Sequence, residues 1–425
     1  MNTVIHSLDR WLNAPRSITA FLLIAASCVL GTASLLAAED ASDKPRARDL
    51  GIPFDGQTGP LNAITDVAGV RVGHQTLIEG EGAWVAGQGP VRTGVTAIFP
   101  FGDDPSAVAY AAYHALNGNG EMTGTIWMDE SGTLSGPIMI TNTHSVGVVR
   151  DAVTEWSLMK SGGQLAWSLP VVAETWDGPW PPYGGLNDIN GFHVKKEHVF
   201  AALDAASDGP VAEGNVGGGT GMICNEFKGG IGTASRRFTA GTDQYTLGVL
   251  VQCNYGRRDW LRVAGIPVGR EIGARICYEG EVPPGRIEPQ CDAEDLSSDR
   301  PELGSIIVVV ATDAPLLPHQ LKRVAQRVTL GLGRLGSAAS DSSGDIFVAF
   351  STANKVAFDE EPALVETLAN PYLTPVFVAT VEATEEAVVN AIIAAETMTG
   401  ADGYRVPRLP HDDLMQVLRR HSIAE

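Results

Sequence analysis

The chain alternates short apolar runs with longer segments in which apolar residues recur at helical spacing. Two runs, 245–254 and 305–312, are nearly uncharged, which is typical of central strands that are covered on both faces. The segments 318–332 and 382–398 combine apolar and polar positions at helical spacing and predict amphipathic helices. Strands that alternate with helices in this way predict an α/β fold built in layers.

The N-terminal half follows the same plan with shorter elements. Its strand-like runs are separated by glycine turns and cover 69–72, 94–99 and 137–141. A helix is predicted over 143–160, because its apolar periodicity stops at a pair of glycines. The segment 177–185 contains three prolines and is expected to be an irregular loop. We find no linker between domains.

The first residues show the pattern of an export signal. Arg10 and Arg16 precede an apolar run over 18–38, and a polar stretch follows. We expect cleavage after Ala38 and exclude residues 1–38 from the fold. The run is also long enough for an uncleaved membrane anchor, which stays open as an alternative. Export predicts a periplasmic or secreted protein in an oxidising compartment.

Composition narrows the classes of protein that remain. Apolar residues make up 44% of the chain and charged residues 19%, which fits a globular protein. The net charge of −20 argues against nucleic acid or an anionic membrane surface as a partner. No spacing of cysteines and histidines resembles a zinc site.

Four cysteines lie beyond the export signal. Cys277 and Cys291 bracket a segment rich in proline and glycine, and we predict a disulfide between them. Cys224 and Cys253 lie in strand-like contexts, which are more typical of buried free thiols.

A dense glycine stretch covers 213–221. One interpretation is a backbone cradle whose N–H groups face a ligand or an oxyanion. The other is a tight linker between strands. The stretch matches neither a Walker loop nor a dinucleotide-binding fingerprint.

The step Gly304-Ser305 stands directly before a strong strand. A serine hydroxyl can attack the preceding carbonyl, shift the acyl group from nitrogen to oxygen, and leave an ester that water hydrolyses. Glycine suits the position before the cut because it has no Cβ and tolerates strained geometry. The product would be a serine whose free α-amine, with a pKa of about 8, can serve as a base. Taken alone, the step is more often an ordinary turn.

A second polar group begins another strand-like run. Ser343 and Asp345 are two positions apart, so in an extended chain they lie on one side. A carboxylate beside a serine can orient a proton relay toward a nucleophile. The alternative is a turn of serine and aspartate that simply starts the strand.

Several blocks, in this order, resemble the exported L-aminopeptidase/D-amidase-esterase family of the DmpA type, which includes the β-peptidyl aminopeptidases. The resemblance runs from about Arg46 to Ala353. The blocks that carry it are 51–56, 89–96, 117–121, 141–147, 186–191, 213–221, 304–309 and 343–346.

The resemblance implies a four-layer αββα sandwich, similar in architecture to N-terminal nucleophile hydrolases. It implies self-cleavage between Gly304 and Ser305 into an α chain, 39–304, and a β chain, 305–425. Ser305 would be the nucleophile, Ser343 and Asp345 its partners, and Asn254 the amide that stabilises the oxyanion. The family also implies a homotetramer of αβ units and no metal or organic cofactor.

Substrate binding is expected to involve Glu174, because an aminopeptidase needs an anion beside the substrate ammonium. The resemblance leads us to expect a tyrosine near position 176, where this chain has Trp176. The following loop supplies Tyr183 instead. For His144 we expect a structural role.

These residues predict a self-processed serine aminopeptidase or amidase acting on short peptides, amino-acid amides or esters. An acyltransferase of the ornithine acetyltransferase type is the nearest alternative, although that enzyme uses threonine at the junction. A periplasmic binding protein that keeps the scaffold without catalysis is a further alternative.

Overall fold

Two large sheets, stacked face to face, organise the part of the chain that the structure describes. The computed structural model describes residues 44–102, 104, 107–164, 167–293, 301–302, 304–356 and 364–423. The predicted signal segment 1–38 and its cleavage site lie outside these residues. Residues Pro45–Glu425 form one compact unit, which spans the predicted cleavage site.

The larger sheet has six strands and the smaller has four. In spatial order the larger contains β4 (Thr133–Ser135), β3 (Val108–Ala115), β13 (Gly344–Lys355), β12 (Ser305–Thr312), β10 (Asp243–Asn254) and β9 (Gly230–Ala240). The smaller contains β1 (Arg71–Glu79), β2 (Val91–Phe99), β5 (Ile138–Asn142) and β6 (Val171–Thr175). Both sheets are mixed, because β12 and β13 run parallel, as do β5 and β6.

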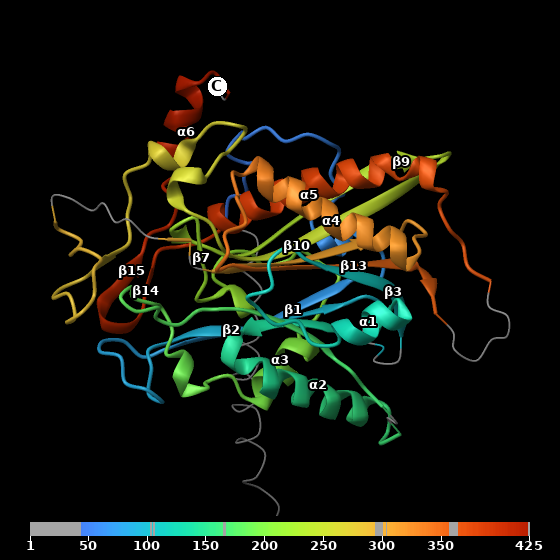
Figure 1. Cartoon of the computed structure of the whole chain (residues 1–425), viewed down its shortest axis with the longest axis horizontal. Helices are drawn as coiled ribbons and strands as arrows, with labels where there is room; N and C mark the ends of the chain where they lie inside the picture. The colour runs from blue at the N-terminus through green and yellow to red at the C-terminus, as the bar shows by residue number, and fades with distance from the viewer. Residues whose placement is uncertain are drawn as a thin grey trace, which may run out of the picture. The chain divides into compact units, whose positions relative to one another are not determined.

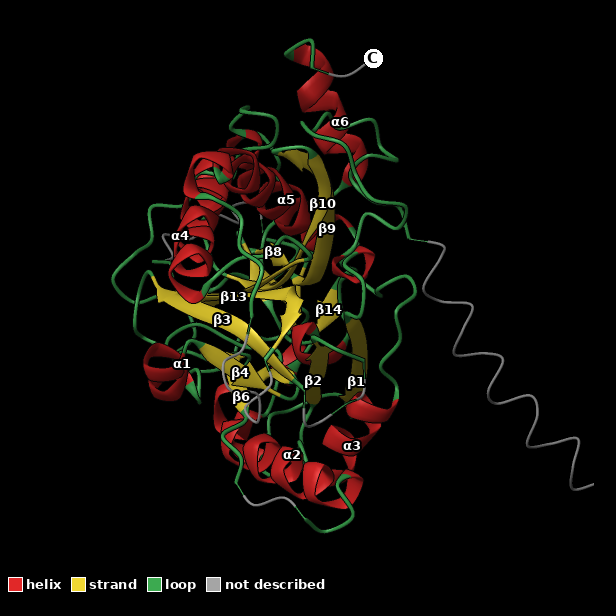
Figure 2. Cartoon of the chain, turned by 90° about the vertical axis from the view of Figure 1, so that its right-hand side faces the viewer, coloured by secondary structure: helices red, strands yellow, loops and turns green. Residues whose placement is uncertain are grey.

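Helices cover the outer face of each sheet (Figures 1 and 2). The larger sheet carries α4 (Pro318–Arg334) and α5 (Thr374–Ile393), and the smaller carries α2 (Val146–Lys160) and α3 (Lys196–Asp204). The remaining α-helices and strands are α1 (Thr125–Ser131), α6 (His411–Arg420), the hairpin β7 (Ile223–Cys224) and β8 (Phe227–Lys228), and a small sheet of β11 (Cys277–Tyr278), β15 (Tyr404–Val406) and β14 (Met398–Thr399). This arrangement confirms the predicted four-layer αββα sandwich.

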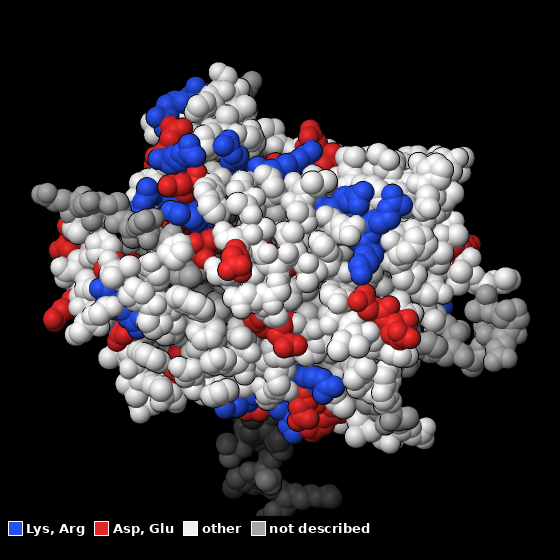
Figure 3. Space-filling view, viewed as in Figure 1, with Lys and Arg blue, Asp and Glu red and all other residues white. Residues whose placement is uncertain are grey.

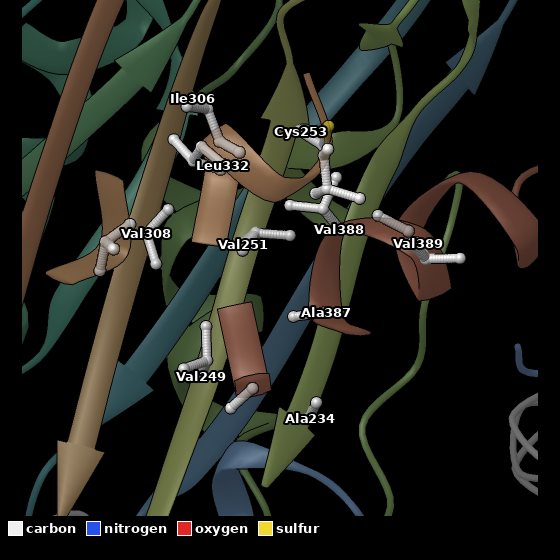
Figure 4. Packing of buried hydrophobic residues seen from close by; sticks show 14 of the residues in the cluster. Ala234, Val249, Val251, Cys253, Ile306, Val308, Leu332, Ala387, Val388 and Val389 are labelled. Atoms are coloured by element: carbon white, nitrogen blue, oxygen red, sulfur yellow. The ribbon is translucent and has the colours of Figure 1, made fainter. Parts of the chain in front are cut away.

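Strand β12 shows why the sequence folds into these layers. All of its residues are buried, and they alternate between two apolar cores. Ile306 and Val308 pack toward α4 and α5, and Figure 4 shows them beside Val251, Leu332 and Val388. Ile307 and Val309 pack between the two sheets. A strand covered on both faces needs no polar positions, which explains its uncharged sequence.

Several predicted elements are confirmed. The helix over 143–160 is present as a 3₁₀ turn, Thr143–Ser145, that leads into α2. The helix over 318–332 is α4, and the two uncharged runs are β10 and β12. The proline-rich segment 177–185 contains no helix or strand.

The predicted helix over 382–398 was wrong in its bounds. The structure begins α5 at Thr374, with Pro375 in the first turn, and ends it at Ile393. Its first half is rich in valine and threonine, which favour strands in isolation. Here that half packs under α4 and over the sheet, and this burial determines the helix.

Among the described residues, no helix is long and apolar enough to cross a membrane. On the face drawn in Figure 3, acidic and basic side chains lie in small interspersed groups.

Two disulfides link the described cysteines. Cys277 and Cys291, the pair predicted from the sequence, are bonded with their Cα atoms 4.9 Å apart. Cys224 and Cys253 are also bonded, which contradicts their interpretation as free thiols. The reason is that β7 lies beside β10, so the two Cα atoms are 5.5 Å apart.

Replacing both Cys277 and Cys291 by serine is expected to lower the free energy of unfolding by about 3 kcal/mol, because a short loop would no longer be closed in the unfolded chain. Denaturant unfolding of the double variant and the wild type measures this difference. A non-reducing digest of the wild type should contain one peptide pair joined through these cysteines. Labelling of both as free thiols would contradict the bond.

Candidate active site

The register of three strands assembles the centre of the site. Asn254, the last residue of β10, lies directly opposite Ser305, the first residue of β12. On its other side Ser305 lies opposite Gly344, the first residue of β13. A nucleophile, an amide and a serine–aspartate turn from distant parts of the chain therefore meet at one edge of the sheet.

Ser305 lies at this edge with 6% of its surface exposed. Its Oγ accepts a hydrogen bond of 3.1 Å from the Gly344 N–H. Because this bond uses a lone pair and not the hydroxyl proton, the proton is free to leave when Oγ attacks a carbonyl.

Gly304 has a backbone conformation that requires glycine. Its φ is +149°, and a Cβ at this position would lie 1.8 Å from the main-chain oxygen of Asn254. Any other residue would force the two strands apart at the predicted cleavage site.

Ser343 and Asp345 are fully buried behind the nucleophile. The Ser343 hydroxyl donates a 2.6 Å hydrogen bond to Asp345 Oδ1, and Asn117 Nδ2 donates to Oδ2 at 3.4 Å. Burial raises the pKa of Asp345 to about 6, and the nearby charge of Glu302 adds to this effect. With its pKa shifted toward neutral pH, the carboxylate of this pair is suited to accept a proton next to Gly344.

The Asn254 amide is held in one orientation. Its Oδ1 accepts a 2.7 Å bond from the Ile223 N–H, and its Nδ2 donates a 2.8 Å bond to the Trp176 carbonyl. An amide nitrogen carries two protons, so one stays available for a developing oxyanion. Asn254 lines the same cavity as Ser305.

That cavity has a volume of about 330 Å³. Its lining includes Gly304, Ser305, Asn254 and the predicted substrate residues Glu174 and Trp176. It also includes four carboxyl side chains, and none of the described lining residues is a lysine or an arginine: the acids are Glu121, Glu174, Asp177 and Glu226. The cavity therefore favours a positively charged ligand.

Glu174 is buried at the end of β6, where its carboxylate is held by two donors. The Glu121 N–H donates a 2.9 Å bond to Oε1, and the Thr143 hydroxyl donates to Oε2. Burial raises the pKa of Glu174, and these hydrogen bonds oppose the rise. The ammonium group of a substrate would supply a positive charge to pair with this buried carboxylate.

Trp176 lines the cavity but does not offer the donor that a tyrosine would. Its indole N–H is used by the Gly178 carbonyl at 2.8 Å. The ring packs edge to face against Trp180, with centroids 5.9 Å apart, and both rings form an aromatic wall.

Tyr183 does not take that place either, because it is buried and is not among the cavity residues. Its N–H donates to the Trp180 carbonyl at 2.6 Å, and its carbonyl accepts from Arg286 at 2.7 Å. The loop thus presents Trp180, a residue that sequence reasoning missed.

Two other predictions concern residues near the cavity. His144 lies between the rings of Trp176 and Phe192, with centroid distances of 5.2 and 5.7 Å, as a packing residue would. In the glycine stretch, the N–H groups of Gly217 and Gly218 donate to threonine hydroxyls of the smaller sheet. These two N–H groups are not free for a ligand, which favours a tight linker in this part of the stretch, whereas Gly221 at its end lines the cavity.

Further site residues were missed because their roles are long-range. Asn117 orients Asp345, and Thr143 and Glu121 hold Glu174. In the sequence their blocks, 117–121 and 141–147, stand out only as marks of the family resemblance, which does not indicate these partners. Asp177 is a buried acid beside Trp176 whose pKa burial raises to about 6.

A serine that begins a central strand between two stacked sheets, with an amide opposite it and a buried serine–aspartate pair behind it, defines a serine hydrolase of the N-terminal nucleophile type. The chain belongs to Peptidase family S58, which matches residues 62–406.

Relatives and solved structures agree with this membership. Beta-peptidyl aminopeptidase BapA of Sphingosinicella microcystinivorans is 54% identical over 389 residues, which are 91% of this chain and 95% of the relative. The L-aminopeptidase D-Ala-esterase/amidase of Ochrobactrum anthropi, described as a variant of the Ntn hydrolase fold, has a TM-score of 0.78 at 47% identity, covering 90% of this chain and all of that one. A Burkholderia sp. β-aminopeptidase has a TM-score of 0.74 at 47% identity, covering 88% and 99%. The chain is thus a hydrolase of the serine aminopeptidase class.

The pH dependence of hydrolysis should reveal the protonation of the Asp345 carboxylate. Only the carboxylate form accepts a proton from Ser343, and the pKa is about 6. Below that pH, protonation of Asp345 should therefore lower kcat/KM by a factor of about ten for each pH unit, in addition to any decrease caused by other titrating groups. Initial rates on an amino-acid amide from about pH 5 to about pH 8 measure this limb.

The matched variant is Asp345→Asn, which cannot titrate. Because the same pair is expected to serve self-cleavage, rates are compared per processed chain. The kcat/KM of the processed variant should be lower at every pH and should lack the decrease that belongs to Asp345. If the limb persists in this variant, it belongs to another group.

Proposed function

We propose that this protein is a self-processed N-terminal serine aminopeptidase that also hydrolyses amides and esters of amino acids. The observation that carries the proposal is the strand register that sets Asn254 and Gly344 on either side of Ser305. In this proposal the register supplies a nucleophile and an oxyanion donor at one cavity, and it sets the buried proton-accepting pair at the start of the strand beside Ser305.

Self-cleavage uses these groups on the chain itself. Ser305 Oγ attacks the Gly304 carbonyl carbon, and its proton passes through the Ser343–Asp345 pair. The free N–H of Asn254 stabilises the oxyanion, which is worth roughly 3 kcal/mol for such a donor. The C–N bond then breaks, and the Ser305 nitrogen takes up the proton. Water hydrolyses the resulting ester and leaves the Gly304 carboxylate and a free serine.

The same site then acts on substrates. The new α-amine of Ser305, together with Ser343 and Asp345, accepts the hydroxyl proton as Oγ attacks the acyl carbon. The leaving amine or alcohol receives that proton, and an acyl-enzyme forms on Ser305. Water, activated by the same groups, releases the acyl product.

Glu174 makes the enzyme an aminopeptidase. Its buried carboxylate lies in the same cavity as Ser305, and no described lining residue neutralises it with a positive side chain. A free N-terminal ammonium therefore binds there and brings the first acyl group to the nucleophile.

The proposed substrates are short peptides, amides and esters with a free amino terminus. One relative is named a β-peptidyl aminopeptidase, one solved structure is a β-aminopeptidase, and another is an L-aminopeptidase and D-Ala-esterase/amidase. A panel of α- and β-amino-acid p-nitroanilides in both configurations would establish the preference of this chain.

The remaining expectations from the sequence stay proposals. They are cleavage into chains 39–304 and 305–425, assembly of these αβ units into a homotetramer, and export to the periplasm or medium.

Replacing Ser305 by alanine should leave a single full-length chain without peptidase activity, since the same oxygen performs both reactions. Denaturing electrophoresis should show two fragments for the wild type and one band for the variant. Normal hydrolysis of amino-acid amides by the variant would disprove the assignment of the nucleophile.

Replacing Glu174 by glutamine should selectively impair substrates with a free ammonium. We expect kcat/KM for such substrates to fall by roughly tenfold to a hundredfold, the loss of one charge-assisted hydrogen bond. The control substrate is the same amide with an acetylated amino group, whose slow hydrolysis should not decrease. An equal loss on both substrates would show that Glu174 supports the fold and not the ammonium.

A further inference from the structure

Glu302 is a buried acid just before the cleavage site. It lies two positions before Gly304, and only 3% of its surface is exposed. Acids are almost never buried to this extent unless they have a partner that compensates the charge. The proposed hydrolytic reaction does not use this carboxyl group, so its burial beside the cleavage site must have another physical reason.

Two hydrogen bonds fasten Glu302 to the turn 340–343. The Ser340 N–H donates a 3.2 Å bond to Glu302 Oε2. The Ser342 hydroxyl donates a 2.8 Å bond to the main-chain oxygen of Glu302. Both the side chain and the backbone of this one residue thus engage the same turn.

The same turn is held on another side by the loop 117–119. Asn117 Nδ2 donates to the Ser340 carbonyl at 2.9 Å, and Asn119 Nδ2 donates to the Ser342 carbonyl at 2.7 Å. The Ser343 N–H closes the turn on the Ser340 carbonyl at 3.0 Å. These hydrogen bonds hold the turn in place, and Glu302 is hydrogen-bonded to it.

The turn 340–343 leads directly into the groups that act on Ser305. The turn ends at Ser343, which donates to Asp345, and continues to Gly344, whose N–H binds Ser305 Oγ. The chain on both sides of the scissile bond is consequently attached to one structure. Glu302 holds the preceding side, and the ladder of β12 and β13 holds the following side.

We propose that Glu302 is a positioning residue for self-cleavage, which sets the Gly304 carbonyl against Ser305 Oγ by fixing the preceding chain to the turn that carries Ser343. The inference rests on the proposed self-processing. It applies to the uncut chain, because cleavage removes the peptide link through which Glu302 acts on Ser305. Turnover of substrate does not need it.

The surroundings of Glu302 support a role beyond packing. Its second oxygen, Oε1, is buried with no hydrogen-bond partner among the described residues, and the same holds for the Tyr255 hydroxyl. The charge of Glu302 raises the pKa of Asp345 and also that of Tyr255, for which burial is the larger cause. An acid with one unsatisfied oxygen beside another acid costs stability, which a purely structural residue would not need.

The test follows the loss of precursor over time in a pulse–chase of the full-length chain, with Ser305→Ala as the marker of the uncut form. Glu302→Ala removes the side-chain acceptor and should slow cleavage by about tenfold, the order expected for one hydrogen bond to a charged group. Glu302→Gln keeps an oxygen for the Ser340 N–H and should cleave within about threefold of the wild type. Glu281→Ala is the control, because Glu281 is an exposed acid; this variant should match the wild type.

A second measurement separates positioning from folding. Once fully processed, the Glu302→Ala enzyme should have a kcat/KM per processed chain within about twofold of the wild type. Ser342→Ala, which removes the bond to the Glu302 backbone, should also slow cleavage by about threefold and covers the case in which Glu302→Ala fails to fold.

The outcomes are distinct. Cleavage of both Glu302→Ala and Ser342→Ala at the wild-type rate would overturn the inference. So would a loss of turnover in processed Glu302→Ala equal to its loss of cleavage rate, because that pattern indicates a damaged fold. A wild-type chain that remains intact would refute the proposed self-processing itself, and with it this inference.

Discussion

The hydrogen-bonded ladder through β10, β12 and β13 is the constraint on which the rest of the structure depends. Its backbone pairing fixes Asn254 and Gly344 beside Ser305. A shift of one residue in either pairing would turn Ser305 to the other face of the sheet, because side chains alternate along a strand. The apolar cores on the two faces prevent such a shift, since Ile306 and Ile307 would exchange surroundings. Packing of the layers thus determines the chemistry of the edge.

The site places its polar groups where this packing ends. Ser305 and Asn254 are terminal residues of their strands and line the cavity. Gly344, also a strand terminus, gives its N–H to Ser305 Oγ. Asp345 is the exception, because it is buried one position inside β13. Its hydrogen bonds from Ser343 and Asn117 make that burial tolerable, and the remaining cost appears as a raised pKa. The same burial that costs stability gives the carboxylate the affinity for a proton that a base requires.

Local pattern predicted those parts of the protein whose structure depends on local chemistry. The uncharged runs became β10 and β12, and the amphipathic segment after them became α4. The start of α5 was missed because valine and threonine near Thr374 favour a strand until α4 covers them. The Cys224–Cys253 bond and the place of Trp180 in one cavity with Ser305 depend on the approach of distant segments, which no spacing reveals. Trp176 does not replace the tyrosine expected near its position, because its indole N–H is occupied by the Gly178 carbonyl.

The order of strands in the larger sheet has a consequence for the cut protein. Strands β12 and β13 follow the cleavage site in the chain, yet they lie between β3 and β10, which precede it. After cleavage the two fragments would remain interleaved, and neither could leave without breaking pairings on both of its sides. Refolding would then change its molecularity: the precursor folds in a unimolecular process, whereas the processed protein must recombine two chains at a rate that depends on their concentration. The lifetime of the mature protein would consequently be governed by the rate at which it opens, as for other kinetically stable proteins.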